Sequence, residues 1–326
     1  MIRRVYLFLI VWLCAGCAAN DSTSKQPYIN QQDGLYGYVD ADGNEVIPCK
    51  YPVLEELDSA FLVYGNANKR YGVIAKNGVI LTPPKYIDID PFIGKRACVS
   101  NEEGDFLLDR SGREVAYARF IRRLSENRFA YRLNSPGNFG LMDENGNKLT
   151  SEKFNNLEDF HEGLAGAQIL TSRNGMRWGF IDEQGTLKIP YRYESVGYFS
   201  EGLAAVKIET GGLWGGLQWG FIDTKGKMVI PPQYTYVYPF SEGLAAVPDD
   251  HTPGRLGYID KTGKVVIPHQ FDIAESFVGG YAIVGEHNNS IYIPDRFGAI
   301  NRKGELVVSM EYTDQEAVLR VLNAMQ

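Results

Sequence analysis

Short apolar runs separated by polar turns follow one another along this chain in a recurring order. The clearest copy reads Trp219-Gly220-Phe221-Ile222-Asp223, followed by Gly226 and then by Val229-Ile230-Pro231-Pro232. Both runs are short and rich in β-branched and aromatic residues, which is typical of strands. An Asp that can bond the backbone two residues on, and a Gly that can take positive φ, suit the tight turn between them. Each copy therefore predicts a β-hairpin, with the Pro pair ending its second strand because Pro cannot donate to a ladder.

A second signature lies between the hairpins. It reads Phe240-Ser241-Glu242-Gly243-Leu244-Ala245-Ala246-Val247. The Glu-Gly pair predicts a turn, and the apolar run after it predicts a third strand. The Tyr- and Phe-rich link before it leaves room for a short fourth strand. Each unit is thus expected to be an antiparallel β-meander.

The hairpin signature occurs eight times, at intervals of 33 to 41 residues, and this period indicates a repeat architecture. The predicted fold class is an all-β repeat protein of eight antiparallel β-meander repeats. A propeller-like arrangement is favoured, with an open superhelical β-array as the alternative. The first unit lacks a leading strand unless residues 27–32 supply it. Aligned on the motif glycine, the copies fall at Gly37, Gly72, Asp105 (where the glycine is lost), Gly140, Gly179, Gly220, Gly257 and Gly298.

The two signatures together resemble the WG-repeat family of bacterial proteins. The resemblance covers residues 33–312 and is closest in repeats five to seven. It is weakest in repeats two and three, where Ala75 replaces the turn Asp and the motif Gly is lost at Asp105. The resemblance implies the fold and the class, and it carries no common activity.

The N-terminal residues have the features of an export signal. Arg3 and Arg4 precede an apolar stretch of nine residues, and Ala15-Gly16-Cys17 then leads into a polar run. This resembles a bacterial lipobox with Cys17 as the lipidated residue. We expect a signal peptide over 1–16, a lipid-anchored linker over 17–32 and display in the cell envelope, at the outer membrane or the surface. An ordinary signal peptide or an uncleaved anchor is the alternative.

The pattern changes period after residue 312. Thr313 and Glu316 form a capping-box pair, and an apolar stripe at helical spacing follows. This predicts a C-terminal helix over 313–326 that caps the repeat domain of residues 33–312; a partner-binding helix is the alternative.

Charge and motif content narrow the function. The net charge of −7 disfavours nucleic-acid binding, which needs Lys and Arg to contact phosphate. The four His residues lack metal-ligand spacing, so we expect no metal and no cofactor. The recurring turn residues have a structural explanation and lie in separate repeats, and no catalytic motif appears, so an enzyme is not expected. These turn residues are Asp182, Gly185, Asp223, Gly226, Asp260 and Gly263.

Two other residue groups admit two interpretations. Seven arginines crowd residues 110–132, as a solvated basic face or as a site for an anionic partner. Cys49 and Cys98 lie in different repeats, and buried free thiols are favoured over a disulfide.

The connections between the third strand and the next hairpin bear on function. In repeats five to eight the connection before the hairpin is lengthened, over residues 168–177, 207–218, 248–255 and 285–296. Equivalent loops of a repeat protein project from one face, often the binding face. The leading function is therefore a lipid-anchored binding or scaffold module for an envelope protein or a polysaccharide. The candidate binding residues are Trp214, Trp219, Asn288 and Tyr292.

Two alternatives remain open. An envelope glycan hydrolase or lyase would need paired carboxylates in a central cleft, for which Asp249-Asp250 is the candidate. A purely structural envelope protein would need only the repeats.

Overall fold

The computed structural model describes residues 26–173, 175–211, 216–249, 254–287 and 295–325. The chain divides into two compact units, Met1–Pro84 and Lys85–Gln326. Cys17, Trp214, Asn288 and Tyr292 lie outside the described residues.

The first unit contains two three-stranded antiparallel sheets. Residues 28–32 supply a first strand beside the first hairpin, as the sequence allowed. The strands are β1 (Tyr28–Gln32), β2 (Leu35–Val39) and β3 (Glu45–Tyr51) in sheet 1, and β4 (Val53–Glu56), β5 (Phe61–Gly65) and β6 (Tyr71–Ala75) in sheet 2.

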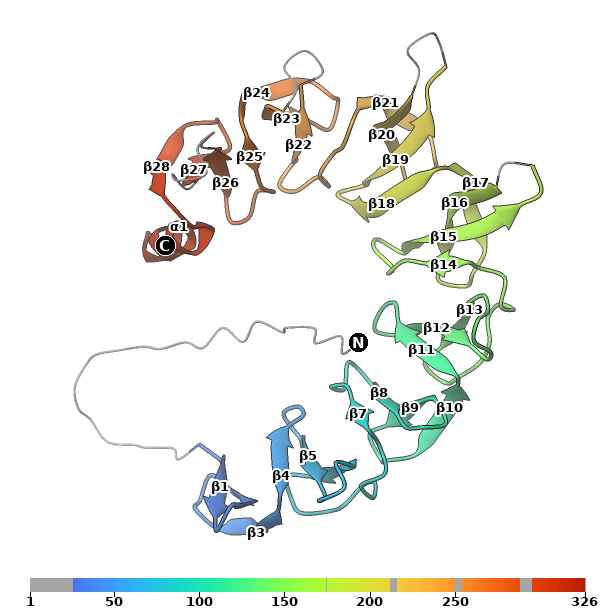
Figure 1. Cartoon of the computed structure of the whole chain (residues 1–326), viewed down its shortest axis with the longest axis vertical. Helices are drawn as coiled ribbons and strands as arrows, with labels where there is room; N and C mark the ends of the chain where they lie inside the picture. Colours follow the sequence, from blue (N-terminus) through green and yellow to red (C-terminus); the bar gives the residue numbers. More distant parts are fainter. Residues whose placement is uncertain (1–25, 174, 212–215, 250–253, 288–294, 326) are drawn as a thin grey trace. The chain divides into compact units, whose positions relative to one another are not determined.

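The second unit contains six antiparallel sheets in chain order (Figure 1). The strands of its first three sheets are β7 (Asp88–Ile89), β8 (Arg96–Ser100), β9 (Asp105–Asp109) and β10 (Glu114–Ala118) in sheet 3; β11 (Phe120–Arg123), β12 (Arg128–Arg132) and β13 (Gly140–Asp143) in sheet 4; and β14 (Asn156–Leu157), β15 (Leu164–Thr171), β16 (Gly175–Asp182) and β17 (Leu187–Tyr193) in sheet 5.

The remaining sheets repeat the plan, and one helix follows them. They comprise β18 (Ser195–Ser200), β19 (Leu203–Glu209), β20 (Leu217–Asp223) and β21 (Met228–Tyr234) in sheet 6; β22 (Leu244–Pro248), β23 (Leu256–Asp260) and β24 (Val265–Phe271) in sheet 7; β25 (Ile273–Ala274), β26 (Tyr281–Glu286), β27 (Arg296–Asn301) and β28 (Leu306–Tyr312) in sheet 8; and α1 (Gln315–Ala324).

A full sheet runs from the aromatic link, through the Leu-Ala strand and the Trp-Gly strand, to the Pro-containing strand. The order β18-β19-β20-β21 shows this plan. The all-β repeat fold with a C-terminal helix is therefore confirmed, and the link does add a fourth strand in several repeats.

The sequence predicted that the Pro pair ends its strand, and this prediction is wrong. Strand β21 continues through Pro231 and Pro232 to Tyr234, and its register with β20 shifts between two pairs, Phe221 with Ile230 and Trp219 with Tyr234. Four steps on one strand thus match two on the other, which is a bulge. β21 is the last strand of its sheet, and a Pro on an edge leaves no ladder bond unmade.

The bulge explains the motif glycine. A Cβ on Gly220 would lie 2.5 Å from the Ile230 carbonyl oxygen and 2.7 Å from the Pro232 nitrogen. Gly179 and Gly257 meet the same obstruction from Ile189 and Ile267. Only a residue without a side chain fits between the bulged strands.

The hairpin turn has the geometry expected of its Asp and Gly. Asp223 Oδ1 accepts hydrogen bonds from the Lys225 and Lys227 amides at 2.9 and 2.8 Å, and Gly226 has φ of +80°. Gly185 and Gly263 have φ of +78° and +87° in the equivalent turns closed by Asp182 and Asp260.

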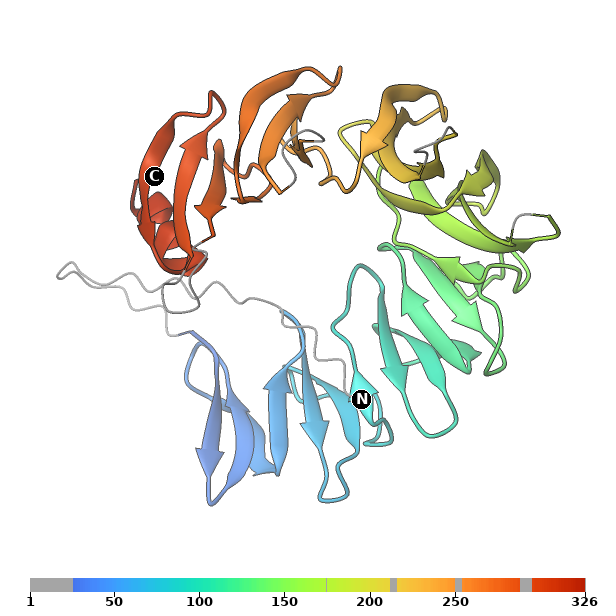
Figure 2. The ribbon, with the colours of Figure 1, turned by 45° about the horizontal axis from the view of Figure 1, so that its top comes forward.

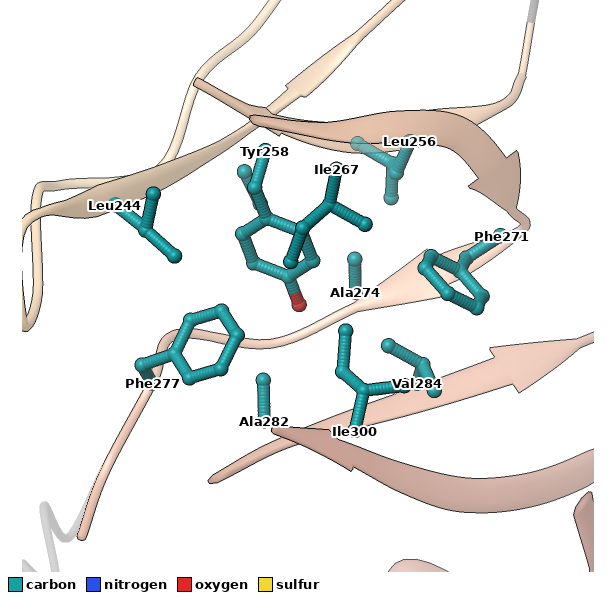
Figure 3. Packing of buried hydrophobic residues seen from close by; sticks show 11 residues of the cluster. Leu244, Leu256, Tyr258, Ile267, Phe271, Ala274, Phe277, Ala282, Val284 and Ile300 are labelled. Atoms are coloured by element: carbon teal, nitrogen blue, oxygen red, sulfur yellow. The ribbon is translucent and has the colours of Figure 1, made fainter. Parts of the chain in front are cut away.

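The core lies between successive sheets. In β19, Leu203 and Ala205 pack with sheet 7, whereas Ala204 and Val206 pack with sheet 5. Sheet 6 therefore buries both faces, and period-2 alternation assigns its residues to two different interfaces. Figure 3 shows one interface. Sheet 7 contributes Leu244, Leu256, Tyr258, Ile267 and Phe271, and sheet 8, with the connection between β25 and β26, contributes Ala274, Phe277, Ala282, Val284 and Ile300.

The predicted C-terminal helix covers the face of sheet 8 that does not pack on sheet 7. Val318 and Leu322 of α1 are buried against the sheet-8 residues Phe297 and Val308. Figure 2 shows the helix beside the strands of this sheet, in red. The N-cap is Asp314, whose Oδ1 accepts from the Ala317 amide at 2.7 Å, rather than Thr313. Among the described residues, no helix is both long and apolar enough to cross a membrane.

The turn geometry gives a stability prediction. At Gly226, φ is positive and a Cβ would lie 3.1 Å from Ile189 of the preceding sheet. Gly226→Val should therefore lower the free energy of unfolding by about 1 kcal/mol or more. Gly211→Ala is the control, because an added Cβ there meets nothing within 4 Å. Denaturant unfolding measures both, and equal stability of Gly226→Val and wild type would contradict the turn assignment.

Candidate functional site

The lengthened connections extend the two central strands of their sheets. In sheet 5, the pairing of β15 with β16 runs out to Thr171 opposite Gly175. In sheet 6, the pairing of β19 with β20 runs out to Glu209 opposite Leu217. The connections in sheets 7 and 8 join the same two strands of the plan, β22 to β23 and β26 to β27. All four therefore leave their sheets at the corresponding end.

Exposed apolar side chains mark the first two of these hairpins. Leu170 is 66% exposed and lies opposite Met176, which is 42% exposed. Leu217, on the hairpin of the next sheet, is 47% exposed. These side chains extend beyond the inter-sheet core, so packing within the unit does not account for them.

A pocket of about 540 Å³ opens between sheets 5 and 6 beside these hairpins. Its volume falls in the range of about 300–1,000 Å³ found for ligand sites. Strands of both sheets line it. The lining residues are Arg177, Arg192, Tyr193 and Glu194 from sheet 5 and the link after it, and Ile208, Glu209 and Met228 from sheet 6.

Local contacts fix the polar residues of this pocket. Arg177 Nη2 lies 2.7 Å from Glu194 Oε1, and its Nη1 donates to the Met176 carbonyl at 2.8 Å. Arg192 Nη2 donates to the Tyr193 hydroxyl at 2.9 Å and to the Gly226 carbonyl at 3.0 Å. Arg177 and Glu194 thus neutralise each other, whereas both acceptors of Arg192 are uncharged.

Trp219 has a packing role in the structure. It is half-buried against the core of sheets 6 and 7, and the Lys207 ammonium lies 5.8 Å from its ring centroid. Its contacts are therefore those of a core-edge aromatic residue. Sequence reasoning missed the pocket, because its lining residues belong to two repeats and follow no common pattern.

The recurring glutamates of the second signature join neighbouring sheets. The amides of Gly202, Gly243 and Gly280 donate to the carboxylates of Glu162, Glu201 and Glu242 of the preceding sheet, each at 2.9 Å. Sequence reasoning assigned these glutamates to turns and allowed weak cation binding, but it did not predict a bond to the next sheet. Their positive φ, between 52° and 54°, confirms the turn, and the carboxylate adds a bond across each interface. We call these bonds the Glu latches.

Further contacts reinforce the Glu latches. Ser200 and Ser241 donate to the Phe240 and Phe277 carbonyls of the next sheet at 2.7 and 2.6 Å. The Lys261 ammonium lies 3.0 Å from the Glu201 carboxylate. Partial burial acts to raise the pKa of Glu201, but the hydrogen bonds from Lys261 and Gly243 outweigh it and hold the pKa below its usual range.

The crowded arginines mostly bond backbone carbonyls. Arg119 donates to the Glu103 carbonyl at 2.8 Å and Arg123 to the Arg96 carbonyl at 2.7 Å. Arg128 Nε donates to the Glu183 carbonyl of the next sheet at 2.6 Å. These bonds account for several of the arginines without an anionic ligand.

Other chemistry-bearing residues are placed as follows. Cys49 and Cys98 form no disulfide, and burial raises the pKa of Cys98 to about 12. Asp249 bonds the Arg255 carbonyl through its amide, and Asp250 lies outside the described residues. Within the part of the chain that the structure describes, no group of three or more His, Cys, Asp or Glu side chains is placed to hold a metal ion.

Comparison with known families decides the class of the chain. The model of the family described as "WG containing repeat" matches seven segments, which together cover more than half of the sequence. The chain belongs to this family. Residues 104–138, where the motif glycine is lost, fall outside the matches. The matched segments are 36–57, 71–103, 139–169, 178–214, 219–247, 257–289 and 297–314.

Solved structures show only distant likeness to this WG-repeat protein. BamB from Moraxella catarrhalis has 9% identity and a TM-score of 0.33, over 79% of this chain and 93% of that one. The extracellular domain of a putative hybrid two-component system from B. thetaiotaomicron has 11% identity and a TM-score of 0.28, over 83% and 48%. No curated protein matches the chain. At these scores, the likeness carries no argument about function.

Proposed function

We propose that this WG-repeat protein is an exported, lipid-anchored binding module whose hairpins in sheets 5 and 6 form a surface for a protein partner. The observation that carries the proposal is the group of exposed apolar side chains, Leu170, Met176 and Leu217, beside an open pocket. Exposed apolar groups rimmed by polar residues mark interaction sites. Arg and Met, which line the pocket, are enriched in protein interfaces.

The repeat fold suits this role. Both faces of the inner sheets are buried against their neighbours, so a partner meets strand ends and connections rather than sheet faces. Lengthened connections on a rigid scaffold are where binding residues concentrate. Polysaccharide binding, enzymatic activity and a purely structural role remain the competing functions.

The envelope part of the proposal rests on the sequence Ala15-Gly16-Cys17. The Cys17 thiol is the group that would accept the lipid. Cys17→Ser should therefore leave unprocessed precursor or move the protein out of the detergent phase in a phase-partitioning experiment. Partitioning equal to wild type would contradict a lipid anchor at Cys17.

The hairpin surface makes a separate prediction. A photo-crosslinking residue at position 170 should capture a protein partner in intact envelopes. Adding Met176→Ser and Leu217→Ser should reduce that product at least about ten-fold, because interface energy concentrates in few apolar contacts. The free energy of unfolding should stay within about 0.5 kcal/mol of the wild-type value, as is usual for surface substitutions.

The matched control is a crosslinker at position 306, where Leu306 is an exposed aliphatic residue on the edge strand of sheet 8. Equal products from both positions, or an unchanged product from the substituted hairpins, would contradict the proposed surface.

A further inference from the structure

The pocket between sheets 5 and 6 lies beside a strand edge with free pairing capacity. Strand β16 pairs with β15 from Gly175 onwards, but its pairing with β17 begins only at Trp178 opposite Tyr193. In the part of the chain that the structure describes, residues 175–177 therefore have a strand partner on one side only, although the Gly175 and Met176 carbonyls also accept hydrogen bonds from the Thr171 hydroxyl and the Arg177 guanidinium at 2.8 Å. An unpaired strand edge is a template for an added strand.

Apart from the Arg177–Glu194 ion pair, each wall of the pocket carries one charged side chain, and the two have opposite signs. Arg177 and Glu194 neutralise each other at 2.7 Å. Arg192 contacts only neutral acceptors among its hydrogen bonds and remains exposed on the sheet-5 wall. Glu209 is exposed on the sheet-6 wall. A ligand with an acidic group towards Arg192 and a basic group towards Glu209 is complementary to this site.

An apolar strip separates these charges. Ile208 and Met228 are half-buried against the core of sheets 5 and 6, and both line the pocket. Tyr193 is only 1% exposed, so the one aromatic residue of the lining offers no ring face to stack against a sugar. These walls suit an aliphatic side chain better than a pyranose ring.

We propose that the pocket and the free edge of β16 bind an extended polypeptide segment of the partner. An apolar anchor residue enters between Ile208 and Met228. An acidic residue on one side of the anchor faces Arg192, and a basic residue on the other side faces Glu209. The main chain of the segment pairs with residues 175–177. This inference rests on the proposed protein-binding function and names the chemistry that the hairpin surface recognises.

The chain contains a matched control. In sheet 7, Arg255 occupies the position of Arg177, two residues before the motif glycine, and its Nε lies 3.5 Å from Asp272. Asp272 occupies the position of Glu194, directly after the Pro-containing strand. The same ion pair is thus present one sheet beyond sheet 6 and outside the pocket lining. Its loss should leave binding unchanged.

The test uses the full chain carrying Cys17→Ser and a blocked nonapeptide with a central leucine, glutamates before it and lysines after it. A second peptide has serine in place of the leucine. Fluorescence anisotropy should show the leucine peptide binding at least about ten-fold more tightly, since burying one aliphatic side chain has about that effect. Maltohexaose should not compete with it.

Two protein variants locate the binding. Met228→Trp fills the pocket from a half-exposed position and should weaken leucine-peptide binding at least about ten-fold, as should Arg192→Glu. Arg255→Ala should leave it within about two-fold of wild type. Thermal melting checks that each variant folds, and Ile208→Trp replaces Met228→Trp if the latter does not.

The inference would be overturned if the serine peptide bound as tightly as the leucine peptide. It would also be overturned if Met228→Trp bound the leucine peptide as tightly as wild type, or if maltohexaose displaced that peptide. The crosslinking result separates the two proposals. If crosslinking depends on the hairpins but the pocket variants bind the leucine peptide as wild type does, the protein-binding function stands and this inference falls. If crosslinking does not depend on the hairpins, the proposed function falls whatever the peptide does.

Discussion

The fold of the second unit depends on the close approach of each sheet to the next. Both faces of the inner sheets are buried, so a single repeat cannot complete its own core. The approach is close enough that a Cβ on Gly226 would lie 3.1 Å from Ile189, and one on Gly263 would lie 3.3 Å from Ile230. The hairpin turn of one sheet thus rests on the Ile of the Pro-containing strand before it. The same Gly satisfies the turn conformation and the packing.

The Glu latches add directional hydrogen bonds to the apolar packing between successive sheets. Each carboxylate reaches the next sheet's turn amide, and a bond to an ionised acceptor is stronger than a neutral one. In the earlier repeats, Arg96 and Arg128 bond the Glu144 and Glu183 carbonyls of the following hairpins at 2.6 Å instead. Sheet 8 has Val278 and Gly279 where the Ser and Glu would be, and α1 covers its far face instead of another sheet. Sheet 3 also lacks these polar residues, with Ile93 and Gly94 at the same positions, and there Arg96 makes the bond to the next sheet.

Local signals in the sequence were sufficient for the repeat, the hairpins and the C-terminal helix. The turn at Asp223 and Gly226 could be predicted because its bonds span only four residues. The bulge at Pro231 could not, because it depends on β21 being an edge strand. The Glu latches were missed for a similar reason. Glu201 and the Gly243 amide that it binds are 42 positions apart in the sequence. The recurring Glu also has a sufficient local explanation as a turn residue. The pocket was missed because two different sheets line it, through residues such as Arg192 and Met228 that belong to no common motif.

Cross-sheet bonds to half-buried turns hold sheets 5 to 8 together as one cooperative array, which then presents its lengthened hairpins rigidly. Amide hydrogen exchange at the glycines of these turns in the native protein tests this most directly. Gly163 is an internal reference, since its φ of +79° matches the other turns while the described contacts give its amide no carboxylate partner. The account predicts that the amides of Gly202, Gly243 and Gly280 are as protected as the strands beside them and exchange far more slowly than Gly163. Exchange of all four amides at the same fast rate would contradict it.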